Sequence, residues 1–293
     1  MSSDGKGTNK LAVFTLIAVV FVWGLDFVGV EYCTAHMSTM LIATFKLVLG
    51  GVIVLAFCLI KYKGLHFEKK DISRVIILGL MLAGYMNVES YGIGKISSPT
   101  ASLILAIVPV IGLLADRVLN NVKITGVRVA GIVGSIVGVA LLVLTTGESL
   151  GGSASGVIAI CIGALIWASY IIVSKDIFEK YNLMQALAVI LLTSGIVSIP
   201  FVFVFDHPIY CDPDPILFAI LIGTTLFSTI LAEWLYAYSI SKLSITMVSM
   251  AENIIPLVTV IFAWILLGTT LNTLQIIGGL IIIGSVTIIT VKE

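Results

Sequence analysis

Residues 220–267 read ILIGTTLFSTILAEWLYAYSISKLSITMVSMAENIIPLVTVIFAWILL, two long apolar runs joined by the short polar stretch SKLS. Glu233 and Glu252 interrupt these runs, and Pro256 follows Glu252 by four residues. A carboxylate at the centre of a bilayer costs roughly 2.5–3.5 kcal/mol, so it needs a partner or a water-filled cavity. Pro256 has no N–H to bond the carbonyl of Glu252, so a carboxylate and a freed carbonyl coincide in mid-helix. The stretch predicts a polar site within membrane-spanning helices.

The whole chain has the composition of an integral membrane protein. Of its 293 residues, 59% are hydrophobic and 11% are charged, whereas soluble domains carry about 25% charged residues. Because a helical span needs ~20 mostly apolar residues, nearly all of the chain can be assigned to spans and no soluble domain is expected. The expected spans are 11–30, 37–60, 73–93, 99–119, 125–146, 155–174, 184–205, 215–240, 244–267 and 271–291.

The basic residues orient these spans. With the N-terminus inside, fourteen of the sixteen Lys and Arg residues fall in cytoplasmic segments, Lys95 falls in an outer loop and Lys46 lies within a span. Cytoplasmic loops of membrane proteins carry an excess of Lys and Arg. The pattern predicts a multi-pass protein with both termini in the cytoplasm.

The chain also repeats itself. Trp23, Met40 and Gly51 recur 144 residues later as Trp167, Met184 and Gly195, and the pattern Tyr-x-Ile-x-Lys-x-Ser at 91–97 recurs 147 residues later at 238–244. Five spans per repeat is an odd number, so the second half is inverted relative to the first. The expected fold is an all-α integral membrane protein with ten transmembrane helices in two inverted five-helix repeats, residues 1–147 and 154–293.

Two prolines occupy equivalent mid-span positions, Pro109 and Pro256. Interrupted helices in inverted repeats are typical of transporters, whose sites lie near the midplane between the halves. A tolerated kink is the alternative, because proline is common in membrane helices.

Small residues distinguish the fifth and tenth spans. The fifth carries Gly131, Gly134 and Gly138, and the tenth carries Gly278, Gly279 and Gly284. Small residues let helix backbones approach closely. We interpret these spans as packing helices within the molecule or, alternatively, as a dimer surface, so the protein is a monomer or a homodimer.

The chain resembles the EamA family of the drug/metabolite transporter superfamily. The residues that carry the resemblance are Trp23-Gly24, Trp167-Ala168, Asn87 to Tyr91, Ser97 to Ala101, Ile107-Val108-Pro109, 232–241, 249–256 and 266–268. The resemblance covers essentially the whole chain. It implies a cell (inner) membrane protein with a central cavity formed by the first four spans of each repeat. It also implies transport of metabolites, often export of amino acids or related compounds.

Charged residues inside the spans are the first candidates for the substrate site. Lys46 lies too deep in its span to reach water, so it should pair with an intramembrane acid or bind an anionic substrate group. Its candidate partners are Glu89, Glu233 and Glu252. Three acids for one base favour a substrate that contains a cation, or proton coupling through a carboxyl group. Asp26, near an outer helix end, is interpreted as an interfacial residue.

Polar and aromatic side chains complete the predicted cavity. Trp23, Trp167, Tyr170, Trp234 and Tyr238 lie at or near mid-span, where they either pack between helices or line a cavity suited to an apolar or cationic group. On the third span, Asn87 and Tyr91 share one face while Tyr85 and Glu89 share another. Both faces cannot point to the cavity, and we expect Asn87 and Tyr91 to do so.

The resulting hypothesis is a secondary active transporter that exports a small metabolite, such as an amino acid or amine, by alternating access and with protons as a candidate coupling ion. A multidrug or small organic cation efflux carrier is the main alternative, and a passive channel is a further one. An enzyme is not expected, because no paired Ser/His or HExxH motif lies on a span. No P-loop is present. We expect no cofactor, metal or nucleic acid, only a small-molecule substrate and the lipid bilayer.

The four cysteines show no metal-ligand spacing. Cys33 and Cys211 both fall in expected outer loops, where a disulfide between them is one hypothesis.

Overall fold

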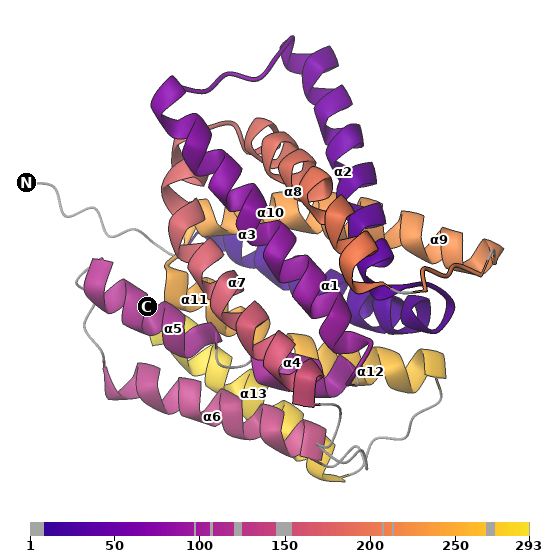
Figure 1. The fold of residues 1–293 in the computed structure, drawn as a ribbon. Helices are drawn as coiled ribbons and strands as arrows, with labels where there is room; N and C mark the ends of the chain where they lie inside the picture. Colours follow the sequence, from indigo (N-terminus) through magenta and orange to yellow (C-terminus); the bar gives the residue numbers. More distant parts are fainter. Residues whose placement is uncertain are drawn as a thin grey trace, which may run out of the picture.

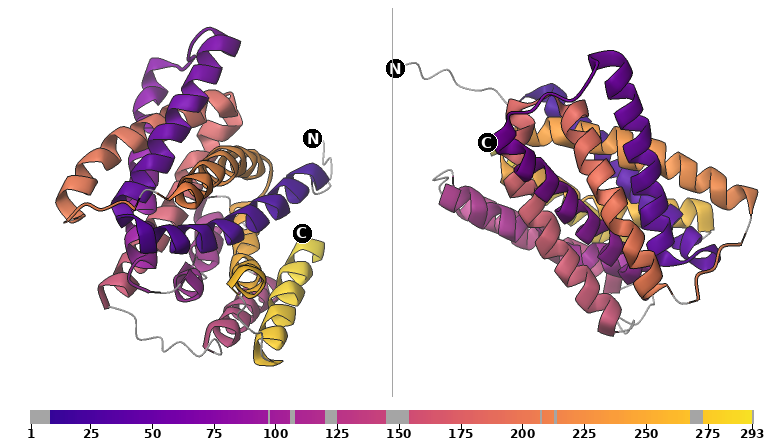
Figure 2. Two further views of the ribbon diagram at one scale, coloured as in Figure 1. Left: turned by 90° about the vertical axis from the view of Figure 1, so that its right-hand side faces the viewer. Right: turned by 45° about the horizontal axis from the view of Figure 1, so that its top comes forward.

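The computed structural model describes residues 9–96, 98–105, 108–119, 125–144, 154–206, 208–212, 214–267 and 273–292. The described elements form a bundle of helices (Figures 1 and 2). They are α1 (Lys10–His36), α2 (Thr39–Tyr62), α3 (Lys69–Ile93), α4 (Ser98–Leu105), α5 (Val108–Leu119), α6 (Gly126–Leu144), α7 (Ala154–Lys180), α8 (Leu183–Phe205), α9 (Pro215–Thr224), the π-helix η1 (Thr225–Ala232), α10 (Glu233–Lys242), α11 (Ile245–Glu252), α12 (Ile255–Leu267) and α13 (Thr273–Lys292).

Within the described residues, seven helical segments are long and apolar enough to cross a membrane. Three of the expected spans fall instead on shorter described pieces, namely the pair α4–α5 and the helices α6 and α13. The expectation of an all-helical membrane protein is therefore confirmed. Ten spans in inverted repeats remain a prediction.

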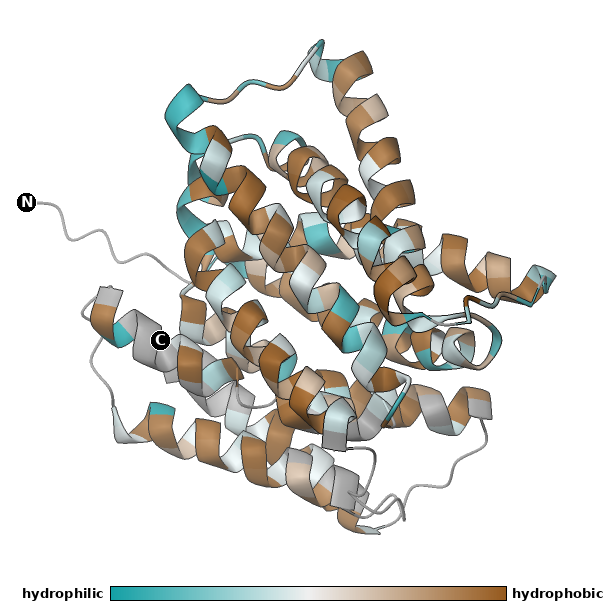
Figure 3. Ribbon diagram, viewed as in Figure 1, coloured by the Kyte–Doolittle hydropathy of each residue, from teal (hydrophilic) through white to brown (hydrophobic). Residues whose placement is uncertain are grey.

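The outside of the bundle is apolar, as a lipid-facing surface requires. Figure 3 shows hydrophobic residues along most of each helix, with hydrophilic residues gathered at helix ends and in loops. Exposed side chains include Phe14 at 68%, Ile60 at 83% and Leu280 at 65%. Helices that are hydrophobic all round are typical of membrane spans.

Helices α2 and α8 cross at a pair of glycines. A Cβ on Gly51 would lie 2.8 Å from the backbone nitrogen of Leu192, and a Cβ on Gly195 would lie 2.9 Å from that of Val48. The two contacts are reciprocal, because Val48 and Gly51 precede Leu192 and Gly195 by the same 144 residues. Only glycine lets the two backbones approach this closely.

A cluster of charges joins the beginning of α3 to the end of α7. Lys180 Nζ lies 2.6 Å from an oxygen of Asp71 and 2.7 Å from one of Glu68. The Tyr181 hydroxyl donates to Asp71 at 2.7 Å. Helix α7 therefore meets α3 at an end expected to face the cytoplasm.

Helices α6 and α13 lie side by side along one edge of the bundle (Figures 1 and 2). A Cβ on Gly138 would lie 2.7 Å from the carbonyl oxygen of Gly278. This glycine contact is internal to the chain.

The disulfide hypothesis is wrong. Cys33 is buried and Cys211 is exposed, and both thiols are free. Cys211 instead pairs through its backbone with Met37 in an isolated β-bridge.

Candidate substrate-binding site

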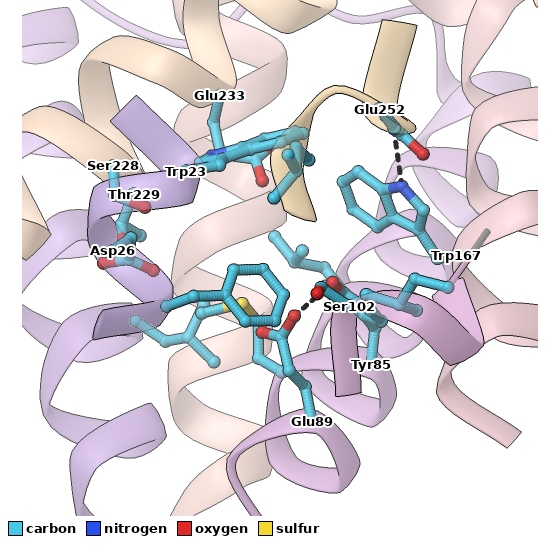
Figure 4. Close-up of a pocket in the computed structure, with 16 residues that line it drawn as sticks. Trp23, Asp26, Tyr85, Glu89, Ser102, Trp167, Ser228, Thr229, Glu233 and Glu252 are labelled. Atoms are coloured by element: carbon cyan, nitrogen blue, oxygen red, sulfur yellow. Dashed lines mark hydrogen bonds between the residues drawn. The ribbon is translucent and has the colours of Figure 1, made fainter. Parts of the chain in front are cut away.

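A polar cavity lies inside the bundle, and Figure 4 shows the side chains around it. Its volume is about 50 Å³, which is enough for a few water molecules at roughly 10–15 Å³ each. The residues around it include four acids, three serine or threonine residues and four aromatic residues: Asp26, Glu89, Glu233, Glu252, Ser102, Ser228, Thr229, Trp23, Phe27, Tyr85 and Trp167. We refer to this space as the polar cavity.

A helix break brings Glu252 to the wall. Helix α11 ends at Glu252, and α12 begins at Ile255. Between them, the N–H of Asn253 bonds the carbonyl of Met250 at 3.1 Å, and the N–H of Ile254 bonds that of Ala251 at 3.0 Å. These tighter turns precede Pro256, which cannot donate to the carbonyl of Glu252.

The first half has a proline at the equivalent place. The described part of α4 runs to Leu105 and that of α5 starts at Val108, 147 residues before Glu252 and Ile255. Pro109 is the second residue of α5, as Pro256 is of α12. Residues 106 and 107 lie outside the described part of the chain.

The π-helix η1 supplies a second polar stretch of the wall. It begins after α9 and passes directly into α10 at Glu233. Ser228, Thr229 and Glu233 line the polar cavity. A π-helix turn holds more residues than an α-helix turn and is frequent at functional sites.

Trp167 lies at the centre of an aromatic cluster. Its ring centroid is 4.6 Å from that of Tyr85, 5.2 Å from Tyr170 and 5.5 Å from both Trp23 and Tyr236. These distances suit aromatic pairs. Trp23, Tyr85 and Trp167 reach the cavity, while Tyr170 is fully buried behind Trp167.

The three glutamates have different hydrogen-bond partners. Glu252 accepts from Trp167 Nε1 at 2.9 Å and from the Tyr236 hydroxyl, and Glu89 accepts from the Tyr85 hydroxyl. Glu233, which is 6% exposed, makes no hydrogen bond or ion pair with any residue that the structure describes. A buried carboxylate without a partner is costly, so Glu233 is the one available to a ligand.

Lys46 pairs with Asp26, and the expectation that its partner is one of the three glutamates is wrong. Its Nζ lies 2.8 Å from both oxygens of Asp26, and Lys46 is 1% exposed. Asp26 therefore faces the bundle interior and the polar cavity, not the outer interface. The two side chains come from consecutive helices, α1 and α2, and meet although they lie 20 residues apart in sequence.

Four predicted cavity residues lie elsewhere. Asn87 donates to Ser198 Oγ at 2.6 Å in the contact of α3 with α8, and the Tyr91 hydroxyl lies 3.3 Å from Ser155 Oγ. Trp234 is 37% exposed, and Tyr238 packs partly buried against the core. Tyr85 and Glu89, on the other face of α3, line the polar cavity instead.

The main residue that the sequence did not indicate is Tyr236, which donates to Glu252. It follows Glu233 by three residues and is the counterpart of Glu89 at the 147-residue offset. Either spacing could have indicated from the sequence that Tyr236 belongs to the site. No group of three or more His, Cys, Asp and Glu side chains suited to a metal occurs among the described residues.

Comparison with known proteins identifies the family. The EamA-like transporter family matches the chain twice, over residues 10–144 and 154–291. The chain belongs to the EamA-like transporter family. It is therefore a multi-pass membrane transporter and not an enzyme, and its two family domains agree with the repeat seen in the sequence.

Named relatives support this assignment without fixing a substrate. The chain is 22% identical to the uncharacterized transporter YoaV of Bacillus subtilis, with 91% of this chain and 92% of YoaV covered. It is 24% identical to the uncharacterized inner membrane transporter YedA of Escherichia coli, with 95% and 90% covered. It is 21% identical to an S-adenosylmethionine/S-adenosylhomocysteine transporter of Chlamydia muridarum, with 89% and 85% covered.

A protein of known crystal structure has the same fold. It superimposes with a TM-score of 0.78 over 98% of each chain at 16% identity.

Proposed function

We propose that this EamA-family protein is a secondary active transporter that exports a small metabolite across the cytoplasmic membrane by alternating access. Residues 1–147 and 154–293 form two inverted halves with the polar cavity between them. The reciprocal contacts of Gly51 and Gly195 support this arrangement, as do Pro109 and Pro256 at equivalent positions. Both termini face the cytoplasm, in keeping with the distribution of Lys and Arg.

The substrate carries a cationic group. The observation behind this proposal is the charge of the polar cavity: four acids line it, and Lys46 neutralises only Asp26. Trp23 and Trp167 add aromatic faces, which attract cations. Amines and amino acids fit this chemistry. S-adenosylmethionine, an organic cation with an amino-acid group, also fits it and is the substrate that one relative's name gives.

Proton coupling is part of the proposal. Glu89, Glu233 and Glu252 lie in a space from which bulk water is largely excluded, where protonation and cation binding compete for the same charge. Proton binding to Glu233 during return of the empty carrier would link substrate export to proton entry. Outward direction follows the family's usual role.

Counterflow in proteoliposomes tests the proposal. Proteoliposomes loaded with an unlabelled candidate compound should take up the labelled compound from outside faster than empty proteoliposomes do. An imposed pH gradient should drive net uptake of the labelled compound. The candidates come from a panel of amines, amino acids and S-adenosylmethionine, first ranked by thermal stabilisation of the purified protein. Flux without acceleration by substrate on the opposite side would indicate a channel and contradict the proposal.

A further inference from the structure

A second cavity adjoins the polar cavity and is lined mainly by hydrocarbon. It measures about 870 Å³ and lies where α1 passes α9, η1 and the end of α12. Its apolar walls are Val22, Leu25, Val28, Ile220, Phe227 and Leu266. We refer to it as the apolar groove.

The apolar groove opens toward the lipid. Leu25 is 42% exposed, Phe227 60% and Leu266 58%. On the outside of a membrane bundle such side chains face acyl chains, so a hydrocarbon group can enter the groove without crossing water.

The two cavities share part of their walls. Asp26 and Ser228 line both of them. Figure 4 shows these two residues together on one side of the polar cavity, opposite Glu252 and Trp167. One ligand can therefore place a polar end in the polar cavity and an apolar end in the groove.

The charges specify the polar end. No Lys, Arg or His is among the described residues that line either cavity, whereas Glu31 lines the groove and four acids line the polar cavity. Beside the shared wall, Glu233 has no partner among the described residues, and the buried hydroxyl of Thr229 has none either. A positively charged head group would use both.

We infer that the protein binds amphiphilic cations, with the head group beside Glu233 in the polar cavity and the hydrocarbon tail in the apolar groove. This inference rests on the proposed role of the polar cavity as the substrate site. It adds the substrate class: organic cations that carry an alkyl or similarly apolar arm and that enter laterally from the membrane.

A substitution can fill the groove without disturbing the backbone. Gly223 lines the groove but not the polar cavity, and a Cβ there meets no atom within 4 Å. Gly284 in α13 is a matched control, because a Cβ there also meets nothing within 4 Å and the residue lines neither cavity. Gly223→Phe and Gly284→Phe make the same change at two open helical positions.

The experiment measures binding of butyl- and octyltrimethylammonium to protein in lipid nanodiscs. Each methylene that leaves water contributes about 0.8 kcal/mol, or about fourfold in affinity. Because a longer chain also partitions into the lipid, the difference between variants is the informative quantity. Wild type and Gly284→Phe should bind the octyl compound at least ~10-fold more tightly than the butyl compound. Gly223→Phe should lose most of that preference and bind the butyl compound as wild type does.

Three binding results would each overturn the inference. They are an octyl preference that persists in Gly223→Phe, octyl sulfate binding as tightly as the octyl cation, and Glu233→Gln binding both cations as wild type does. Bilayer phospholipid found in the groove by native mass spectrometry, together with no octyl preference in wild type, would assign the groove to lipid and also overturn it. Counterflow of a short-chain metabolite tests the transport proposal separately, since it does not require the groove.

Discussion

The glutamates of the polar cavity differ in what stabilises their charge. Two donors, Trp167 and Tyr236, hold Glu252, whereas Glu233 has no described partner. Hydrogen bonds to a charged group contribute about 1.5–3 kcal/mol each, and a buried charge without them is destabilising. The proposal therefore gives the two positions different roles: Glu252 holds the aromatic cluster through its hydrogen bonds, and Glu233 binds a proton or a cation.

This difference predicts opposite effects of two amide substitutions. Glu252→Gln should lower the melting temperature, since it weakens two charge-assisted hydrogen bonds. Glu233→Gln should leave it unchanged or raise it, and should abolish transport driven by a pH gradient. Thermal unfolding of purified variants and proteoliposome flux would check both. Equal destabilisation by the two substitutions would contradict the assignment.

The buried pair of Lys46 and Asp26 allows a second test. Removing one member of a buried ion pair leaves an unpaired charge and typically costs 3–5 kcal/mol, whereas replacing both is often neutral. Lys46→Met and Asp26→Asn should each destabilise the protein strongly, and the double variant should recover most of the loss in a thermal-unfolding cycle. Glu89→Gln is the matched control and should give Lys46→Met no such recovery. Recovery of stability with Glu89→Gln would mean that Lys46 pairs with Glu89 and not with Asp26.

Part of the site could be predicted from single residues and part could not. Acids at mid-span indicated a polar interior, because a carboxylate without a partner is costly in hydrocarbon. Tryptophans at mid-span, away from the membrane interfaces, indicated that this interior is also aromatic. The error lay in choosing faces. Asn87 and Trp234 occupy equivalent positions in the two repeats, so one wrong choice of face was made twice. The amide nitrogen of Asn87 donates to Ser198 in a contact between helices, and only packing between helices distinguishes such a residue from a cavity residue.

Among elements, interruptions build the site. The break after Glu252 could be predicted from Pro256, because proline removes a backbone donor. The π-helix η1 could not, since no residue type requires it. The sequence pattern 215–240 predicts one span of regular helix, whereas the structure has the wider turn of η1 where it contacts α1 and α2.

The crossing of α2 and α8 yields a prediction at this scale. A Cβ at Gly51 would lie within 3.0 Å of three backbone atoms of α8, which a rotamer change cannot relieve. Gly51→Ala should therefore force the helices apart and destabilise the protein by about 1–3 kcal/mol. Gly284→Ala, made where a Cβ has open space, should be neutral or slightly stabilising. Similar melting temperatures for the two variants would refute the close crossing.

For the whole molecule, the two halves share one backbone plan but divide the chemistry unequally. Positions related by the repeat hold Trp23 and Trp167, which both line the polar cavity. At the 147-residue offset, however, Met86 corresponds to Glu233 and Leu105 to Glu252. In the proposed mechanism, the repeated frame supplies the alternating motion, and the asymmetric side chains supply a single binding site.

The proposed inverted halves would also fix which loops face which side of the membrane. The exposed Cys211 lies in the loop between α8 and α9, expected outside, and Gly64 lies in the Lys-rich loop between α2 and α3, expected inside. In intact cells, a membrane-impermeant maleimide should label Cys211, and Cys211→Ala should abolish the signal. Gly64→Cys in the Cys211→Ala background should be labelled only after permeabilisation. An odd number of the expected spans separates the two loops. Labelling of both from one side would therefore mean that a helix expected to cross the membrane does not, and the inverted arrangement would fail with it.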